Sequence, residues 1–249
     1  MKKKLKLKNN FIPVNIPKIF SQDKINVKKC LDAGWISSEG AFVKSFETNF
    51  SKYHNRKYAV AVSSGTAALH LSVVALGIGS GDEVITTPIT FCATSNAALY
   101  QGADVKFVDI DENTLNIDSN LIEAKITKRT KAIMPVDFRG HPANLPEIRQ
   151  IADRHNLKII EDGSHSIGST YIHNGKKYAC GDGVHADFCT YSFHPVKHIT
   201  TGEGGVVRPL EPLAFQLEKG NGAPMTGMPA PGARRSQADY CPHCGEALT

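Results

Sequence analysis

The sequence predicts an α/β fold, a mostly parallel sheet with helices on both of its faces. Between residues 58 and 207, short apolar runs alternate with longer segments of helical periodicity. Strands and helices that alternate at this spacing form βαβ units, in which a helix connects two parallel strands. The length of 249 residues and the 41% hydrophobic content fit one large domain, or one domain and a fragment of another.

Two helices are predicted before the alternating region begins. Residues 24–33 have helical character, and residues 41–53 place Phe42, Phe46, Phe50 and Tyr53 on one helical face. In the alternating region, Asp118 is predicted to cap the helix 118–126. The expected strands are 58–62, 83–87, 105–108, 132–136, 157–160, 187–192 and 204–207, and the expected helices are 66–76, 93–100, 118–126 and 145–155.

The two ends of the chain differ from its body. Residues 1–11 form a basic arm that supplies five lysines, so most of the formal charge of +5 comes from this arm. Residues 12–207 are predicted to be the ordered domain. Residues 208–249 contain six prolines and are predicted to be a disordered tail foreign to that domain.

Composition also disfavours several classes of protein. No basic stripe interleaved with aromatic residues indicates nucleic-acid binding. The chain has no apolar run as long as a membrane span and no secretory signal, and its scattered cysteines fit reduced thiols in the cytoplasm. The motif Cys241-Pro242-His243-Cys244 supplies half of a zinc site, with no second pair downstream, and we predict no metal.

A lysine after the strand 187–192 is the main functional signal. Lys197 lies among Phe193, Pro195, Val196 and Ile199, before a glycine-rich turn. An ordinary solvated lysine is one interpretation. The other is a nucleophile, because removal from water lowers the pKa of an amine and frees it for covalent chemistry.

Two further segments offer polar groups at strand ends. After the strand 58–62, Gly65, Thr66 and Ala67 begin a helix whose free N–H groups suit an anion, although an ordinary capped turn has the same pattern. Asp162 follows the expected strand 157–160, at the strand end where α/β sheets bind ligands, but it could also cap a turn. The region lacks the glycine fingerprint of a dinucleotide fold and the lysine of a Walker A loop.

Aromatic residues complete the pattern. Phe91 begins a helix after a strand and is either a core residue or a stacking platform, and His165 is either structural or a ligand. A phosphate cradle, a flat platform, a strand-end aspartate and a buried lysine together match pyridoxal 5′-phosphate. This cofactor carries a phosphate, an aromatic ring, a pyridine nitrogen and an aldehyde.

On these motifs the chain resembles the DegT/DnrJ/EryC1/StrS family of fold-type-I aminotransferases, from about Ile12 to Val207. The resemblance is closest to members that aminate C4 of nucleotide-linked 4-keto-6-deoxyhexoses, as in the pseudaminic-acid pathway and perosamine formation. The matching segments are Gly34 to Gly40, Ser64 to His70, Gly81 to Pro88, Val108 to Asp111, Glu161 to His165 and Ser192 to Lys197.

The resemblance implies roles for residues and for the chain. Lys197 would form the Schiff base and Asp162 would pair with the pyridine nitrogen, while Phe91 would stack on the ring and His165 would lie beside it. Gly65, Thr66, the Ala67 backbone and Ser192 would hold the phosphate. The implied substrates are a nucleotide-linked ketosugar and glutamate, and the implied assembly is a homodimer.

The chain departs from the family after Val207. Family members continue into a smaller C-terminal domain, so the sequence is expected to be truncated there. The rival hypothesis is an inactive remnant that binds phosphate compounds weakly. The lysine itself favours transamination, since the family's dehydratases carry histidine in its place.

Overall fold

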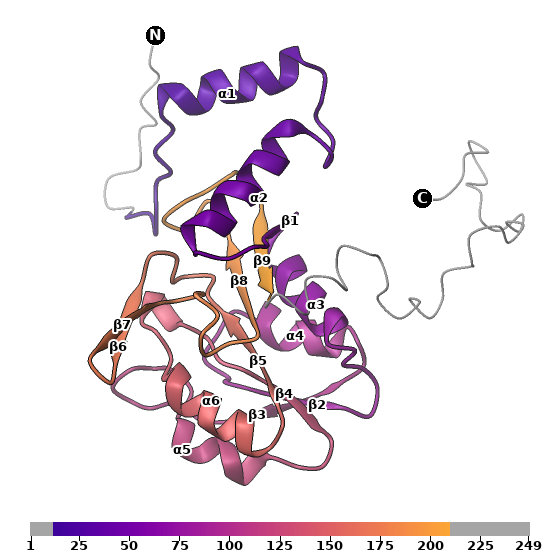
Figure 1. Cartoon of the computed structure of the whole chain (residues 1–249), viewed down its shortest axis with the longest axis vertical. Helices are drawn as coiled ribbons and strands as arrows, with labels where there is room; N and C mark the ends of the chain where they lie inside the picture. Colours follow the sequence, from indigo (N-terminus) through magenta and orange to yellow (C-terminus); the bar gives the residue numbers. More distant parts are fainter. Residues whose placement is uncertain (1–11, 210–249) are drawn as a thin grey trace, which may run out of the picture.

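The computed structural model describes residues 12–209 and confirms the predicted α/β fold (Figure 1). A seven-stranded sheet has the order β1-β9-β8-β5-β4-β2-β3. All neighbouring strands are parallel except β9, which runs antiparallel to β1 and β8. The strands are β1 (Val60–Val62), β2 (Glu83–Thr86), β3 (Asp104–Phe107), β4 (Thr130–Met134), β5 (Lys158–Asp162), β8 (Phe188–Ser192) and β9 (Gly205–Pro209).

Helices cover both faces of this sheet, as the sequence predicts. On one face, α3 (Gly65–Ala75) and α4 (Ala93–Leu99) pack against alternate strand residues such as Met134 and Ile160. On the other, α5 (Ser119–Ile122) and α6 (Leu145–Arg154) pack against the intervening residues, including Ile133. Because successive side chains of a strand point to opposite faces, a strand covered on both sides reads as a continuous apolar run.

The helix expected over residues 118–126 is shorter in the structure. The α-helical part ends at Ile122, and a 3-10 turn follows at Glu123–Lys125. The Asp118 side chain accepts a hydrogen bond from Asn120 N, which confirms the predicted cap.

A cluster of aromatic side chains lies between helix α2 (Ala41–Tyr53) and the strand β8. Phe46 and Phe50 contact Phe193, and His54 stacks on Tyr191 with ring centroids 5.3 Å apart. His54 is 5% exposed, and within residues 12–209 neither of its ring nitrogens has a hydrogen-bond partner. Burial, with a smaller contribution from Arg208, therefore lowers the pKa of His54 from 6.5 to about 4.

Only part of the predicted apolar face of α2 is buried. Phe42 is 44% exposed and Tyr53 is 66% exposed, whereas Phe50 is buried. The helix that precedes it, α1 (Ser21–Asp32), buries no residue and lies away from the sheet, beyond α2 (Figure 1).

A hairpin between β5 and β8 is absent from the sequence-based prediction. Strands β6 (Thr170–His173) and β7 (Lys176–Ala179) pair in antiparallel fashion around Asn174-Gly175. Both turn residues have positive φ, 49° and 73°, as a type I′ turn requires. An Asn-Gly pair between β-forming runs is a strong hairpin signal, and it was available in the sequence.

The last strand extends beyond its predicted end. β9 pairs with β8 as far as Pro209 opposite Phe188, so Arg208 and Pro209 belong to the sheet and not to the tail. Arg208 is completely buried. The predictions for the basic arm 1–11, for residues 210–249 and for the Cys241–Cys244 motif lie outside the described residues.

Within residues 12–209, no helix is both long enough and apolar enough to cross a membrane.

Candidate active site

A cavity of about 370 Å³ lies at the carboxyl ends of several parallel strands. Loops that follow β1, β2, β4, β5 and β8 all contribute to its walls. In open α/β sheets this edge is the usual ligand site, because the loops there converge while the strands themselves stay buried. The cavity is lined by Ser64, Gly65, Thr66, Leu69, Thr90, Phe91, Ala93, Val136, Asp162, Ser164, His165, Ser192, His194, Val196, Lys197 and Glu203.

Seven of the eight predicted site residues line this cavity: Gly65, Thr66, Phe91, Asp162, His165, Ser192 and Lys197. The exception is Ala67. Its backbone N–H donates to Ser64 Oγ at 3.1 Å, which makes Ser64 the N-cap of α3. The structure therefore contains the ordinary capped turn that the sequence left open, and Gly65 and Thr66 still face the cavity.

The start of α3 requires a glycine for steric reasons. A Cβ atom on Gly65 would lie 2.7 Å from Cβ of Ser192, closer than any normal contact. The first turn of α3 thus approaches the end of β8 directly. This contact brings the positive end of the helix dipole and two hydroxyl side chains, Thr66 and Ser192, to one wall.

Asp162 is held from two sides at the end of β5. Thr94 Oγ1 donates to Asp162 Oδ2 at 2.7 Å, and Ser164 N donates to Asp162 Oδ1 at 3.2 Å. Thr94 is completely buried in the first turn of α4, and its hydroxyl also contacts Thr90 Oγ1 at 2.8 Å. Thr94 follows Phe91 by three residues, and no local sequence signal separates it from an ordinary residue of a helix start.

Lys197 is half-buried in the turn after β8. Two of the neighbours expected to enclose it, Val196 and Ile199, are 48% and 52% exposed, whereas Phe193 is buried. Burial lowers the pKa of Lys197, while the negative charge of Asp162 partly opposes this effect. A lower pKa increases the fraction of neutral amine at a given pH, and the neutral amine is the nucleophile.

His165 is fixed by a neighbouring loop. Its Nδ1 accepts a hydrogen bond from Arg139 N at 3.3 Å, so a neutral ring carries its proton on Nε2. Burial lowers the pKa of His165, and the charge of Lys197 adds to the effect. Arg139 itself has φ of 55°, a left-handed conformation that is uncommon outside glycine and that brings its N–H to the imidazole.

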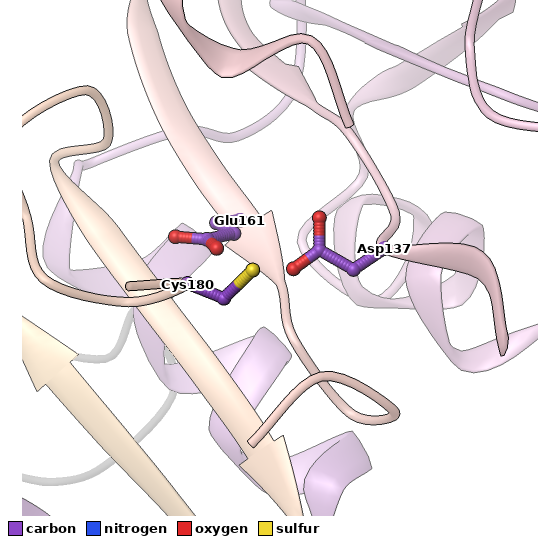
Figure 2. A group of neighbouring side chains, drawn as sticks. All are labelled: Asp137, Glu161 and Cys180. Atoms are coloured by element: carbon purple, nitrogen blue, oxygen red, sulfur yellow. The ribbon is translucent and has the colours of Figure 1, made fainter. Parts of the chain in front are cut away.

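A second group of ionisable side chains is buried and does not line the cavity (Figure 2). Asp137, Glu161 and Cys180 place their terminal atoms within 4.8 Å of one another. Glu161 precedes Asp162 on β5 and therefore points to the other face of the sheet. Burial raises the pKa of both Asp137 and Glu161, and their mutual repulsion raises the pKa of Glu161 further.

This group has the residue types of a metal site, but its oxygens already accept hydrogen bonds. Asp137 accepts from Ala143 N at 2.9 Å and from Ser166 Oγ at 2.6 Å, and both oxygens of Glu161 accept from Gly181 N at 3.0 Å. The raised pKa of Glu161 favours a proton held between the two carboxyls. These hydrogen bonds connect the segments at Ala143 and Ser166 to Asp137, and the segment at Gly181 to β5.

Together the fold and the cavity define an α/β protein with a desolvated lysine opposite a strand-end aspartate. Comparison with known proteins identifies the family. The model of the DegT/DnrJ/EryC1/StrS aminotransferase family matches residues 17–212, and the chain belongs to this family.

Individual relatives agree with that assignment. The chain is 45% identical over 196 residues to a GDP-perosamine synthase of Caulobacter vibrioides, covering 79% of this chain and 51% of the relative. It is 42% identical over 200 residues to the spore coat polysaccharide biosynthesis protein SpsC of Bacillus subtilis, covering 80% and 50%. The chain thus spans about half the length of the curated relatives it matches.

Solved structures show the same fold. A putative sugar aminotransferase of Streptococcus pneumoniae, in its PLP-form, superposes with a TM-score of 0.76 at 32% identity, covering 84% of this chain and 55% of that one. A 3-amino-5-hydroxybenzoic acid synthase superposes with a TM-score of 0.75 at 33% identity, covering 82% and 52%.

Proposed function

We propose that this chain carries the cofactor site of a pyridoxal-phosphate-dependent aminotransferase whose substrate is a nucleotide-linked 4-keto-6-deoxysugar. Glutamate is the proposed amino donor. The observation that carries the proposal is the convergence of Lys197, Asp162 and the α3 N-terminus on one cavity. Membership of an aminotransferase family and similarity to a GDP-perosamine synthase support the reaction class and the sugar substrate.

The residues fit each part of this cofactor. The absence of a side chain on Gly65 lets the first turn of α3 touch Ser192, so helix N–H groups suited to a phosphate lie beside the Ser192 hydroxyl. Phe91 is 70% exposed beside the cavity, where its ring face is available for stacking. Asp162 offers a carboxylate at the far wall. When bound, pyridoxal phosphate supplies an electrophilic carbon for a lysine and a protonated ring that withdraws electrons.

In this proposal Lys197 has two tasks. Its Nζ would be the neutral amine that holds the cofactor by its aldehyde, a role that the lowered pKa favours. When it is not bonded to the cofactor, the same Nζ would accept and return a proton as a general acid and base. The half-buried position of Lys197 limits the competition from water for that proton.

Asp162 keeps the pyridine nitrogen protonated by offering a negative charge to it. Thr94 and Ser164 supply hydrogen bonds that hold the carboxylate in one orientation. His165, whose Nδ1 is engaged by the backbone, keeps an N–H on Nε2 that can be donated beside the ring. Thr66 and Ser192 add hydroxyl donors to the phosphate cradle.

The proposal also includes a homodimer and a cytoplasmic location. The homodimer follows from the family resemblance. Free thiols at Cys30, Cys92, Cys180 and Cys189, the cysteines within residues 12–209, support a reducing compartment.

Covalent capture of the cofactor tests the site directly. Purified protein is incubated with pyridoxal phosphate, reduced with borohydride and digested, and the modified peptide is identified by mass spectrometry. We expect the pyridoxyl group on Lys197, no such adduct at position 197 in Lys197→Ala, and normal labelling in Lys176→Ala, a control on the exposed hairpin. An adduct on other lysines with Lys197 unmodified would contradict the assignment.

Turnover is tested separately with glutamate and a panel of nucleotide 4-ketosugars, by assay of 2-oxoglutarate. Labelling of Lys197 together with turnover supports the whole proposal. Labelling without turnover for any sugar supports the rival hypothesis, a chain that binds the cofactor but does not transaminate.

A further inference from the structure

The segment 13–17, which is remote from the site in sequence, contacts the turn that carries Lys197. Asn15 Nδ2 donates hydrogen bonds to Pro195 O at 3.1 Å and to Lys197 O at 2.8 Å. The two carbonyls lie 180 and 182 residues further along the chain. A single side chain therefore connects the N-terminal segment to the backbone on both sides of Val196.

The turn itself explains why these carbonyls need a partner. Lys197 N donates to His194 O at 2.9 Å, which closes a turn with Pro195 at its second position. The base of the loop is fixed by Phe193 N, which donates to Gly204 O at 2.9 Å, and by Thr200 Oγ1, which donates to Phe193 O at 2.7 Å. These bonds leave the carbonyls of Pro195 and Lys197 without a partner inside the loop.

The side-chain amide of Asn15 can donate to both of these carbonyls. A carboxamide nitrogen carries two N–H donors, and Asn15 directs one to each carbonyl. Both partners are acceptors, so the orientation of the amide is fixed by its neighbours. Pro13 and Pro17 restrict the backbone on either side to extended conformations, which lowers the entropy lost when Asn15 is held in place.

We infer that Asn15 is a positioning residue for Lys197, which sets the place of the reactive amine by holding the backbone of its turn. The inference rests on the proposed function, in that it takes Lys197 as the residue that captures the cofactor. The segment 13–17 would then contribute to the position of the reactive amine.

Release of the turn should change the chemistry of the amine as well as its mobility. In the cavity, Lys197 lies near Asp162 and His165, and the His194 imidazole and the Glu203 carboxylate, 3.5 Å apart, also line it. A looser turn exposes the ammonium to water, so its pKa rises toward the ordinary value for lysine. The rate of cofactor capture should then fall at neutral pH, and its pH profile should shift to higher pH.

The test compares the full chain with Asn15→Ala, Asn15→Asp and the control Asn26→Ala, which removes a half-buried amide that pairs with Gln22 on α1. Asn15→Asp keeps the size of the side chain but offers no donor to either carbonyl. We measure the rate of pyridoxal phosphate capture at Lys197 against pH. Because Asn15 is exposed and water competes for its hydrogen bonds, we expect about a three- to tenfold loss at neutral pH.

A second measurement needs no cofactor. Trypsin cleaves after lysine, and a released turn should be cut after Lys197 faster in both Asn15 variants than in the parent or the Asn26→Ala chain. Unchanged capture rates, pH profile and cleavage in the Asn15 variants would overturn the inference. If the parent chain captures no cofactor at Lys197, the proposed function fails, and tryptic cleavage still decides whether Asn15 holds the turn.

Discussion

Acidification should destabilise this protein through one buried histidine. His54 lies between α2 and β8, stacked on Tyr191, and is 5% exposed. In the unfolded chain its imidazole binds a proton near pH 6.5, whereas burial lowers the pKa in the folded protein to about 4. Between these two values the unfolded state binds more protons than the folded state, so stability falls as the pH falls.

The size of the effect follows from the two pKa values. Below both of them, the difference between 6.5 and about 4 costs about 3 kcal/mol of unfolding free energy. Because the unfolded chain takes up this proton first, the unfolding free energy falls by about 2 kcal/mol between about pH 7.5 and about pH 5. For a domain whose total stability is about 5–15 kcal/mol, such a loss is large.

The assay is urea unfolding at both pH values for the parent chain and for His54→Phe, which keeps an aromatic ring but cannot be protonated. The variant should lose about 2 kcal/mol less than the parent on acidification. His141→Asn, at an exposed position, should behave like the parent. An equal loss in the parent and in His54→Phe would refute the reasoning, because it would show that other groups carry the acid sensitivity.

Two further predictions concern the cavity. Asp162→Asn removes the negative charge proposed to face the cofactor ring. The variant should fold and capture pyridoxal phosphate, but its transamination rate should fall by about 100-fold or more. Near-normal turnover in kinetic assays would show that the carboxylate is structural. Gly65→Ala forces a Cβ to within 2.7 Å of Ser192 Cβ, so it should destabilise the chain by about 1–3 kcal/mol in urea unfolding and weaken cofactor binding in equilibrium titrations. Parent-like values in both measurements would mean that α3 can shift away from β8 without cost.

The order of strands and helices was predictable because it depends on local signals. The boundaries of α2 at Ala41 and Tyr53 match the prediction, and Asp118 caps its helix as expected. Strands covered on both faces are continuous apolar runs, which the sequence displays directly. The β6–β7 hairpin was missed although Asn174-Gly175 marks its turn, because its strands are mostly polar and lack a buried face.

Other features depend on contacts between segments that are distant in sequence. Thr94 acquires its place in the site through Asp162, which lies 68 residues away, and Asn15 acquires its place through the turn of Lys197. No local pattern distinguishes these two residues from other surface or cap-forming polar residues. Their hydrogen bonds exist only once the sheet has brought the strand ends together.

By itself, the sequence determined the α/β class, the strand-end positions of Asp162 and Lys197, and the resemblance to an aminotransferase family. These follow from periodicity and short motifs, which each segment carries within itself. The tertiary structure decided which face of each segment is buried. It therefore decided that Gly65 touches Ser192, that Lys197 is half-buried in the cavity that Asp162 also lines, and that His54 is buried away from water. Burial and desolvation are properties of the assembled chain, because they depend on neighbours that only folding supplies.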